Sequence, residues 1–241
     1  MKGNLVVHHL LIVLGTLKGG YINGGKERPD ILVAPKFVHE GAEYLARVLR
    51  ALSQPPANDK LAIAETQLGL ADLSLEEARP PAEQEAATRQ ALEVFQAQKV
   101  RDDETGAWCV LARALIAQGK VAAAKDAVQH ARSLSAKSQN PGIRWQTGLT
   151  AAQIEIADKD LPHSAGIAAS KELAAIITKA RELGYAEVEL EARLALAEIE
   201  MKTGQATVGR AHLTAIEADA KAKGCGLVAR KADAARSARS S

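Results

Sequence analysis

Residues 104–136 read ETGAWCVLARALIAQGKVAAAKDAVQHARSLSA, and this stretch decides the fold class. In its first half, apolar residues recur at steps of three and four, as on one face of an α-helix: Trp108, Leu111, Ala112 and Leu115. Gly119 interrupts the pattern, and the same stepping resumes at Ala124, Val128 and Ala131. The stretch therefore predicts a helical hairpin with an apolar inner face and a glycine turn.

The rest of the chain repeats this arrangement. From about residue 37 onward the sequence predicts helices over 37–53, 60–77, 82–98, 103–118, 121–136, 142–158, 164–183, 186–203, 206–223 and 226–238. Prolines and glycines separate these segments because proline cannot continue a helix interior and glycine suits the left-handed residue after a helix. The expected hairpin turns centre on Ala78, Gly119, Lys159 and Gly204, which are 41, 40 and 45 residues apart. Helix pairs at such a period indicate a solenoid.

The spacing Trp-x₂-Leu-Ala-x₂-Leu…Gly…Ala-x₃-Val-x₂-Ala resembles the tetratricopeptide (TPR) pattern. The segments at 65–80, 111–140, 189–205 and 222–232 are together similar to the C-terminal TPR arrays of large bacterial regulators, in which a serine/threonine kinase or a winged-helix domain precedes the array. The resemblance implies an all-α, right-handed TPR-like superhelix of about four antiparallel helix pairs with a C-terminal capping helix. We expect two parts, an irregular glycine-rich segment at 1–36 and a helical repeat domain at 37–241. The first helix, 37–53, reads as the second half of a repeat.

The composition excludes several functional classes. The chain of 241 residues is 47% hydrophobic but only 3% aromatic, so its apolar mass is mainly alanine and leucine, which favour helices. A net charge of +2 gives no electrostatic reason to expect nucleic acid. The two cysteines, Cys109 and Cys225, have no ligand-like spacing, which suits a cytoplasmic protein without disulfides or metal. The apolar run at 5–17 is too short to span a bilayer, so no membrane association is expected.

Motifs that carry catalytic chemistry are weak. Gly20-x₄-Gly25-Lys26 is a near match to the P-loop, but Glu27 stands where a hydroxyl residue should bind Mg²⁺. A nucleotide-binding switch or enzyme using this loop is therefore an alternative to a non-enzymatic function. We expect no catalytic residues, no cofactor and no metal. The acidic stretches at 76–77 and 187–191 are interpreted as solvated helix faces.

The TPR resemblance implies that the first helix of each hairpin lines an inner groove. The groove residues expected on this basis are Asp72, Arg113, Gln153, Glu198, Leu149 and Leu194. The sequence thus predicts a non-catalytic scaffold that binds a protein or peptide, as the interaction or sensing region of a bacterial regulator. Charge reversal at Arg113 or Glu198 is expected to weaken binding and spare the fold. A structural module that forms homo-oligomers through the exposed first half-repeat is the other alternative.

Overall fold

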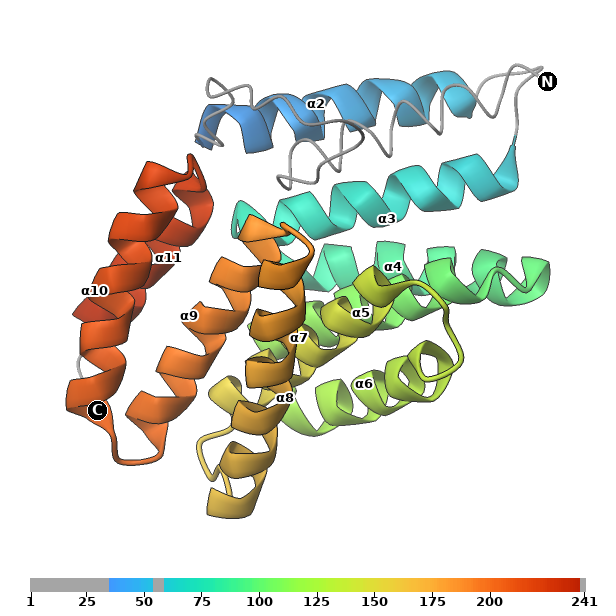
Figure 1. The fold of residues 1–241 in the computed structure, drawn as a ribbon. Coiled ribbons are helices and arrows are strands. Elements are labelled where there is room, and N and C mark those ends of the chain that lie inside the picture. Colours follow the sequence, from blue (N-terminus) through green and yellow to red (C-terminus); the bar gives the residue numbers. More distant parts are fainter. Residues whose placement is uncertain (1–34, 54–58, 239–241) are drawn as a thin grey trace. The chain divides into compact units, whose positions relative to one another are not determined.

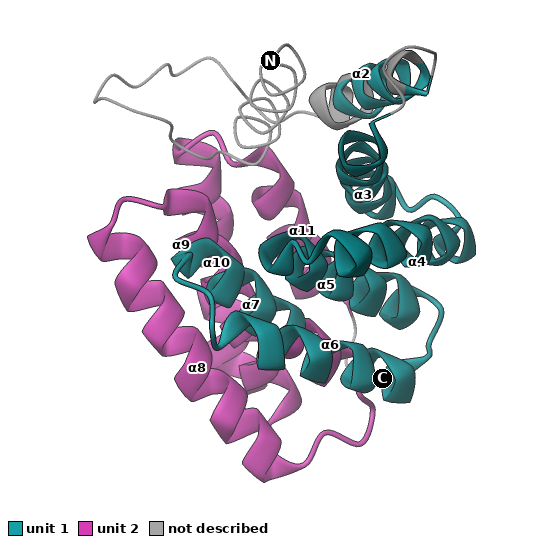
Figure 2. Cartoon of the chain, turned by 90° about the vertical axis from the view of Figure 1, so that its right-hand side faces the viewer, with its two compact units in different colours: residues 1–14, 36–150 teal, residues 15–35, 151–241 magenta. Residues whose placement is uncertain are grey.

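The computed structural model describes residues 35–53 and 59–238, and every regular element in these ranges is an α-helix (Figure 1). All the helices expected from the sequence are present there, and their ends agree within two residues. The predictions for the glycine-rich segment 1–36 and for the Gly20–Lys26 loop lie outside the described residues, apart from 35–36. In the described part the chain divides into two compact units, residues 36–150 and 151–238, and the boundary falls within one helix (Figure 2).

Unit 1 consists of α2 Pro35–Leu52, α3 Lys60–Glu76, α4 Pro81–Gln98, α5 Arg101–Ala117, α6 Val121–Ser135 and the first part of α7 Pro141–Ala157. Each helix from α3 to α6 packs against the next, and α3 also contacts α5. The side-chain carboxylate of Asp59 begins α3 by accepting hydrogen bonds from the backbone N–H groups of Leu61 and Ala62, at 3.1 and 3.2 Å. This chain of neighbours is the nearest-neighbour stacking expected of a helical repeat.

Helix α5 is the centre of unit 1 and is buried on almost every side. Its buried residues are Thr105, Gly106, Ala107, Cys109, Val110, Leu111, Ala112, Ala114 and Leu115. A helix surrounded by other helices needs small apolar residues all round, and alanine allows its neighbours to approach closely. The predicted apolar stripe of α5 is confirmed at Leu111, Ala112 and Leu115, and that of α6 at Ala124, Val128 and Ala131, all buried.

Trp108 joins the two helices of this hairpin. It is half-buried, and its ring stacks on that of His130 from α6, with centroids 4.4 Å apart and planes 16° from parallel. Trp108, which the sequence places on the apolar stripe of this helix, is thus only partly buried, and its ring partner on α6 is an exposed histidine. Stacking of two rings contributes stabilisation beyond that of the apolar area that they bury.

The turn between α3 and α4 adopts the left-handed backbone conformation without a glycine. Gly119, at the equivalent turn between α5 and α6, has φ of +73°, and Ala78 has φ of +54° in the same left-handed region. A side chain with a Cβ atom adopts this conformation at a cost of about 1–2 kcal/mol. The degenerate hairpin thus keeps the standard turn and accepts backbone strain at Ala78.

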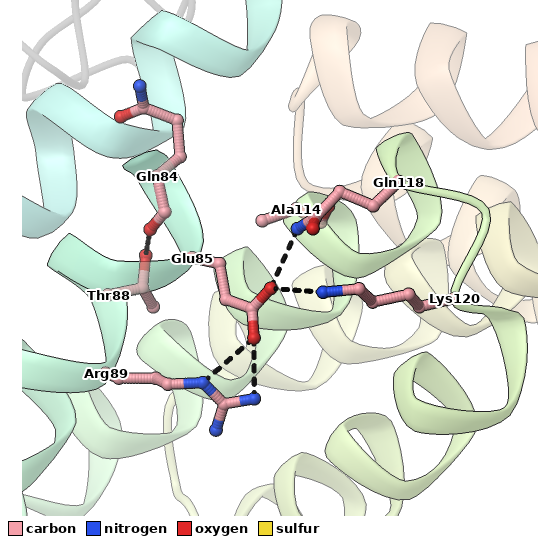
Figure 3. A network of polar contacts seen from close by, with 7 residues as sticks. All are labelled: Gln84, Glu85, Thr88, Arg89, Ala114, Gln118 and Lys120. Carbon is pink, nitrogen blue, oxygen red and sulfur yellow. Dashed lines mark hydrogen bonds and ion pairs between the residues drawn. The ribbon is translucent and has the colours of Figure 1, made fainter. Parts of the chain in front are cut away.

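Glu85 on α4 ties the first hairpin to the second (Figure 3). Its Oε1 accepts from Nε and Nη2 of Arg89 at 3.0 and 2.8 Å, and its Oε2 accepts from Gln118 Nε2 at 2.8 Å and Lys120 Nζ at 3.0 Å. Gln118 and Lys120 flank the turn glycine between α5 and α6, so this carboxylate fixes that turn against α4. Hydrogen bonds from Gln118 and then Arg89 lower the pKa of Glu85 from 4.5 to about 2.

Unit 2 contains the end of α7 followed by α8 His163–Glu182, α9 Ala186–Lys202, α10 Ala206–Ala222 and α11 Gly226–Ser237. Helix α9 packs against α8, α10 and α11, and α10 also packs against α11. The core of α9, α10 and α11 is formed by Leu190, Leu194, Ala197, Leu213, Ile216, Ala220, Val228, Ala229 and Ala232. The outer positions of α11 are polar, as expected for a helix that caps a repeat array.

Two glycines let α8 and α10 approach α9 from its two sides. Gly166 and Gly209 are each the fourth residue of their helix. A Cβ atom at Gly166 would lie 2.8 Å from Thr203 Cγ2, and one at Gly209 would lie 2.6 Å from the carbonyl oxygen of Ala197. Since backbone cannot move away as a side chain can, Gly209 is the stricter requirement. The close approach of α10 to the backbone of α9 therefore requires glycine at this position.

In unit 2, Glu189 is a buried carboxylate that pairs with cationic side chains, as Glu85 does in unit 1. Its buried carboxylate accepts from Arg181 Nε and Nη2 of α8 at 3.1 and 2.8 Å, and Arg193 Nη1 lies 3.8 Å away. Arg193 also donates to Asp219 of α10 at 2.8 Å. The interpretation of residues 187–191 as a solvated face is wrong at Glu189, because a carboxylate pairing with cations on both sides needs to face the neighbouring helices.

The strained turn gives a matched pair of tests. We expect Ala78→Gly to raise the free energy of unfolding by about 0.5–1 kcal/mol, since relief of strain exceeds the added freedom of glycine in the unfolded chain. Gly119→Ala should lower it by about 1 kcal/mol, and purely through the backbone, because a Cβ atom there would meet nothing within 4 Å. Urea denaturation measures both. Destabilisation by both substitutions would contradict the left-handed conformation at Ala78.

The Glu85 network predicts a defined pH dependence. Because the folded pKa lies below the unfolded one, the carboxylate stabilises the fold fully above about pH 4.5, and this contribution is lost as the pH falls toward 2. Glu85→Gln should therefore cost about 1–3 kcal/mol at pH 7 and progressively less at pH 4 and pH 3. Arg89→Met, which removes a mostly exposed partner, should cost under about 1 kcal/mol. A Glu85→Gln cost that is the same at pH 7 and pH 3 would rule out this role.

Candidate binding surface on the A helices

The first helix of each hairpin is called an A helix, and these are α3, α5, α7 and α9. The residues predicted to line a groove all lie on them. In unit 1 they are Asp72 on α3, Arg113 on α5 and Leu149 on α7, and in unit 2 they are Gln153 on α7 with Leu194 and Glu198 on α9. We call these six residues the A-helix row. Their environments differ sharply between the two units.

In unit 1, two residues of the row, Asp72 and Arg113, belong to a largely buried group of three charges. Arg113 on α5 donates one hydrogen bond to Asp72 Oδ1 and another to Glu76 Oε1, both on α3. Asp72 and Glu76 share a face of α3 because they are four residues apart. The exposed fractions of the three side chains are 20% for Arg113, 8% for Asp72 and 17% for Glu76. Charges so far from water are stable only when paired, so this group holds α5 against α3.

Cys109 lies one helical turn before Arg113 on α5 and is fully buried. Its Sγ donates to Thr147 Oγ1 on α7 at 3.8 Å, and Thr147 itself donates to the carbonyl oxygen of Ile143. Burial raises the pKa of the Cys109 thiol to about 11, and the nearby Asp72 carboxylate adds to the shift. The thiol therefore stays protonated at neutral pH and is a poor nucleophile. It fills the seam between α5 and α7 as a small packing residue.

The remaining row residues have different exposures. Gln153 is exposed on α7, Leu149 is half-buried on the same helix, and Leu194 is buried in the core of unit 2 with Leu213 and Val228. Glu198 is half-buried, and burial raises the pKa of its carboxyl to about 7 against the opposing effect of Lys231. Leu194 thus contributes to packing within unit 2. The assignment of the row to a binding groove stays a prediction.

Comparison with solved structures bears directly on the fold. Two chains of nearly identical TPR-like repeats from a kinesin light chain of Podosopora anserina, one of them a variant, are similar to this chain. The variant has a TM-score of 0.53 and covers 92% of this chain and 98% of its own, and the other has a TM-score of 0.50 and covers 92% and 99%; each is 16% identical in sequence. This chain has the TPR-like helical-repeat fold. Comparisons with protein-family models and with curated proteins find no match.

The TPR-like fold explains why the sequence alone did not indicate that Glu76 belongs to the ionic group around Arg113. The interpretation of Glu76 and Glu77 as a solvated face is wrong at Glu76, which pairs with Arg113. The separation of Asp72 from Arg113 is one repeat, 41 residues, so these equivalent positions of α3 and α5 lie side by side. Two acidic residues four apart on one A helix, facing a single arginine one repeat later, are the sequence signal that could have indicated the group.

We also searched the described residues for a metal-binding cluster and for a membrane-spanning helix. Within 35–53 and 59–238, no three or more His, Cys, Asp or Glu side chains form a group that could hold a metal ion. Across the same part of the TPR-like array, each helix is too short or too polar to cross a membrane.

The sequence led us to expect that charge reversal at Arg113 would leave the fold intact. Because Arg113 pairs with Asp72 and Glu76, we now expect that its replacement destabilises the fold. We expect Arg113→Met to lower the free energy of unfolding by about 2–4 kcal/mol, because it leaves two largely buried carboxylates side by side. Arg101→Met, at an exposed position of the same helix, should change it by less than about 0.5 kcal/mol.

A double-mutant cycle separates the pair from packing effects. Asp72→Asn combined with Arg113→Met should cost clearly less than the sum of the two single changes, as expected for side chains in contact. Urea denaturation at pH 7 measures all three variants. Full additivity would show that the two residues are not coupled.

Proposed function

We propose that the protein is a non-catalytic scaffold that binds a protein or peptide along its A-helix row. The observation that carries this proposal is the TPR-like fold itself, in which each A helix places side chains at equivalent positions one repeat apart. The exposed Gln153 and half-buried Leu149 lie one turn apart on α7, so that helix offers polar and apolar contacts together. Binding energy at protein interfaces comes mainly from a few such well-packed apolar anchors framed by polar groups.

Some residues of the row are engaged within the fold, and others are available to a partner. Arg113 is engaged with α3 and Leu194 with the core of unit 2, so these two residues shape the surface and do not act as free contacts. In unit 2, Gln153 on α7 and Glu198 on α9 then supply contacts that a partner would use, and Leu149 precedes Gln153 by one turn of the same helix. A peptide with an apolar side chain for Leu149 and an amide or hydroxyl group for Gln153 matches this sequence of contacts.

A finer proposal concerns the biological setting. The segments that are similar to the TPR arrays of bacterial kinases and winged-helix regulators support a role as the interaction or sensing region of a bacterial regulatory protein in the cytoplasm. Such a region would pass a binding event to an effector domain.

Site-specific photo-crosslinking tests the proposed surface. A photoreactive amino acid at Gln153 on α7 should capture a partner from native cytoplasm, and the captured protein is then identified by mass spectrometry. Lys171 is the matched control, because it is exposed in the same unit but lies on α8, the second helix of its hairpin. We expect capture at Gln153 and at least tenfold less at Lys171. The reverse result would place binding on the other face and overturn the proposal.

A further inference from the structure

The junction between α6 and α7 is a positively charged part of unit 1. Residues 127–154 contain no aspartate or glutamate, although a quarter of the chain is charged. The charged residues of this stretch are Arg132, Lys137 and Arg144, and Lys137 and Arg144 are exposed. All three belong to unit 1. A cationic surface of this kind favours a partner of opposite charge.

The loop brings the guanidinium group of Arg144 back toward Lys137. Arg144 Nη1 donates a hydrogen bond to the carbonyl oxygen of Ser138 at 2.5 Å, and Ser138 directly follows Lys137. The backbone N–H of Asn140 donates to Ser138 Oγ at 3.1 Å, and that of Gly142 donates to Asn140 Oδ1 at 2.9 Å. Because these bonds order the loop, a partner would meet its cations already in place, which lowers the entropic cost of binding.

The charges of Lys137 and Arg144 are not neutralised by carboxylates of the described residues. The guanidinium group of Arg144 binds a neutral carbonyl group, and the ammonium group of Lys137 makes no hydrogen bond within that part of the chain. Both charges are therefore available to a partner.

Two of the acidic residues at the start of α5 face other helices. Glu104 Oε1 accepts a hydrogen bond from Gln96 Nε2 of α4 at 3.1 Å. Burial, and then the charge of Asp103, raise the pKa of Glu65 on α3 to about 7. Glu104 and Asp103 are thus directed toward α4 and α3, and not toward the junction between α6 and α7.

The junctions between successive hairpins in unit 2 differ, because their cations are paired. At the junction of α8 with α9, Arg181 Nη2 lies 2.8 Å from Glu189 Oε1. At the junction of α10 with α11, Lys221 Nζ lies 2.6 Å from Glu217 Oε1. Cations at those junctions are engaged within the fold, whereas Lys137 and Arg144 have no such role.

We propose that the α6–α7 junction is a second contact surface, separate from the A-helix row, which binds an acidic peptide segment of a partner protein through Lys137 and Arg144. Carboxylates of the segment pair with the ammonium group and with the fork of the guanidinium group. The exposed side chains of Gln139 and Asn140, between the two cations, add amide groups for hydrogen bonds. Nucleic acid suits the junction less, because it is bound by broad basic surfaces and this one offers two exposed cations.

Fluorescence anisotropy of a labelled peptide of alternating glutamate and serine, titrated with the full chain, tests the proposal. We expect saturable binding that weakens as salt is added, since exposed charges are screened. Lys137→Gln combined with Arg144→Gln should weaken binding at least about fivefold. Lys159→Gln combined with Lys171→Gln is the matched control, because it removes the same charge from exposed positions of unit 2, and it should change binding less than about twofold.

The single variant Lys137→Gln separates charge from loop order. Its ammonium group makes no hydrogen bond in the described part of the chain, so the loop should keep its structure while binding still weakens. Circular dichroism checks that every variant retains its helices. The proposal is overturned if the peptide shows no saturable binding, if the two double variants weaken it equally, or if single-stranded DNA of the same charge binds more tightly than the peptide.

Discussion

Close packing of alanine-faced helices is the constraint on which both units depend. No single hairpin of this chain can bury its own apolar face, so each helix must be covered by its neighbours in sequence. In α5 the residues that permit this are alanines such as Ala107, Ala112 and Ala114, which are fully buried against adjoining helices. Where even alanine would be too large, glycine takes its place, and at Gly209 it lets α10 approach the backbone of α9. The small side chains bring the helices together closely but leave few large contacts to specify their register.

Ion pairs supply part of that specification. In three places a carboxylate gathers cations or amides across a junction: Glu85 between α4 and the turn after α5, Glu189 between α8 and α9, and Glu217 between α10 and α11. Each is more buried than most of its partners, so the carboxylate is fixed and the longer side chains reach toward it. Such pairs contribute modestly to stability in exposed positions, but a displaced helix would leave them unpaired. They therefore oppose slippage between helices whose apolar faces are nearly uniform.

The residues of the A-helix row differ in how far they are engaged within the fold. At Arg113 the polar groups hold α3 to α5, so a charged residue at a groove position is no evidence that it meets a partner. Gln153 is exposed and has no such structural duty evident from its surroundings, which makes it the better reporter of binding. Glu198 lies between these extremes. It is half-buried, and burial raises the pKa of its carboxyl to about 7.

The sequence by itself determined the helices, their ends and their grouping into hairpins, because helix periodicity and the effects of proline and glycine are local. The apolar stepping around Leu111 and Val128, and the left-handed turns at Gly119 and Gly204, follow from residues close together in the chain. The tertiary structure alone decided which charged residues are solvated. Glu76 and Glu189 belong to acidic stretches that look exposed, but each faces an arginine on a neighbouring helix. The reason is that pairing and desolvation depend on the register between neighbouring helices, and alanine-rich faces leave that register undefined in the sequence.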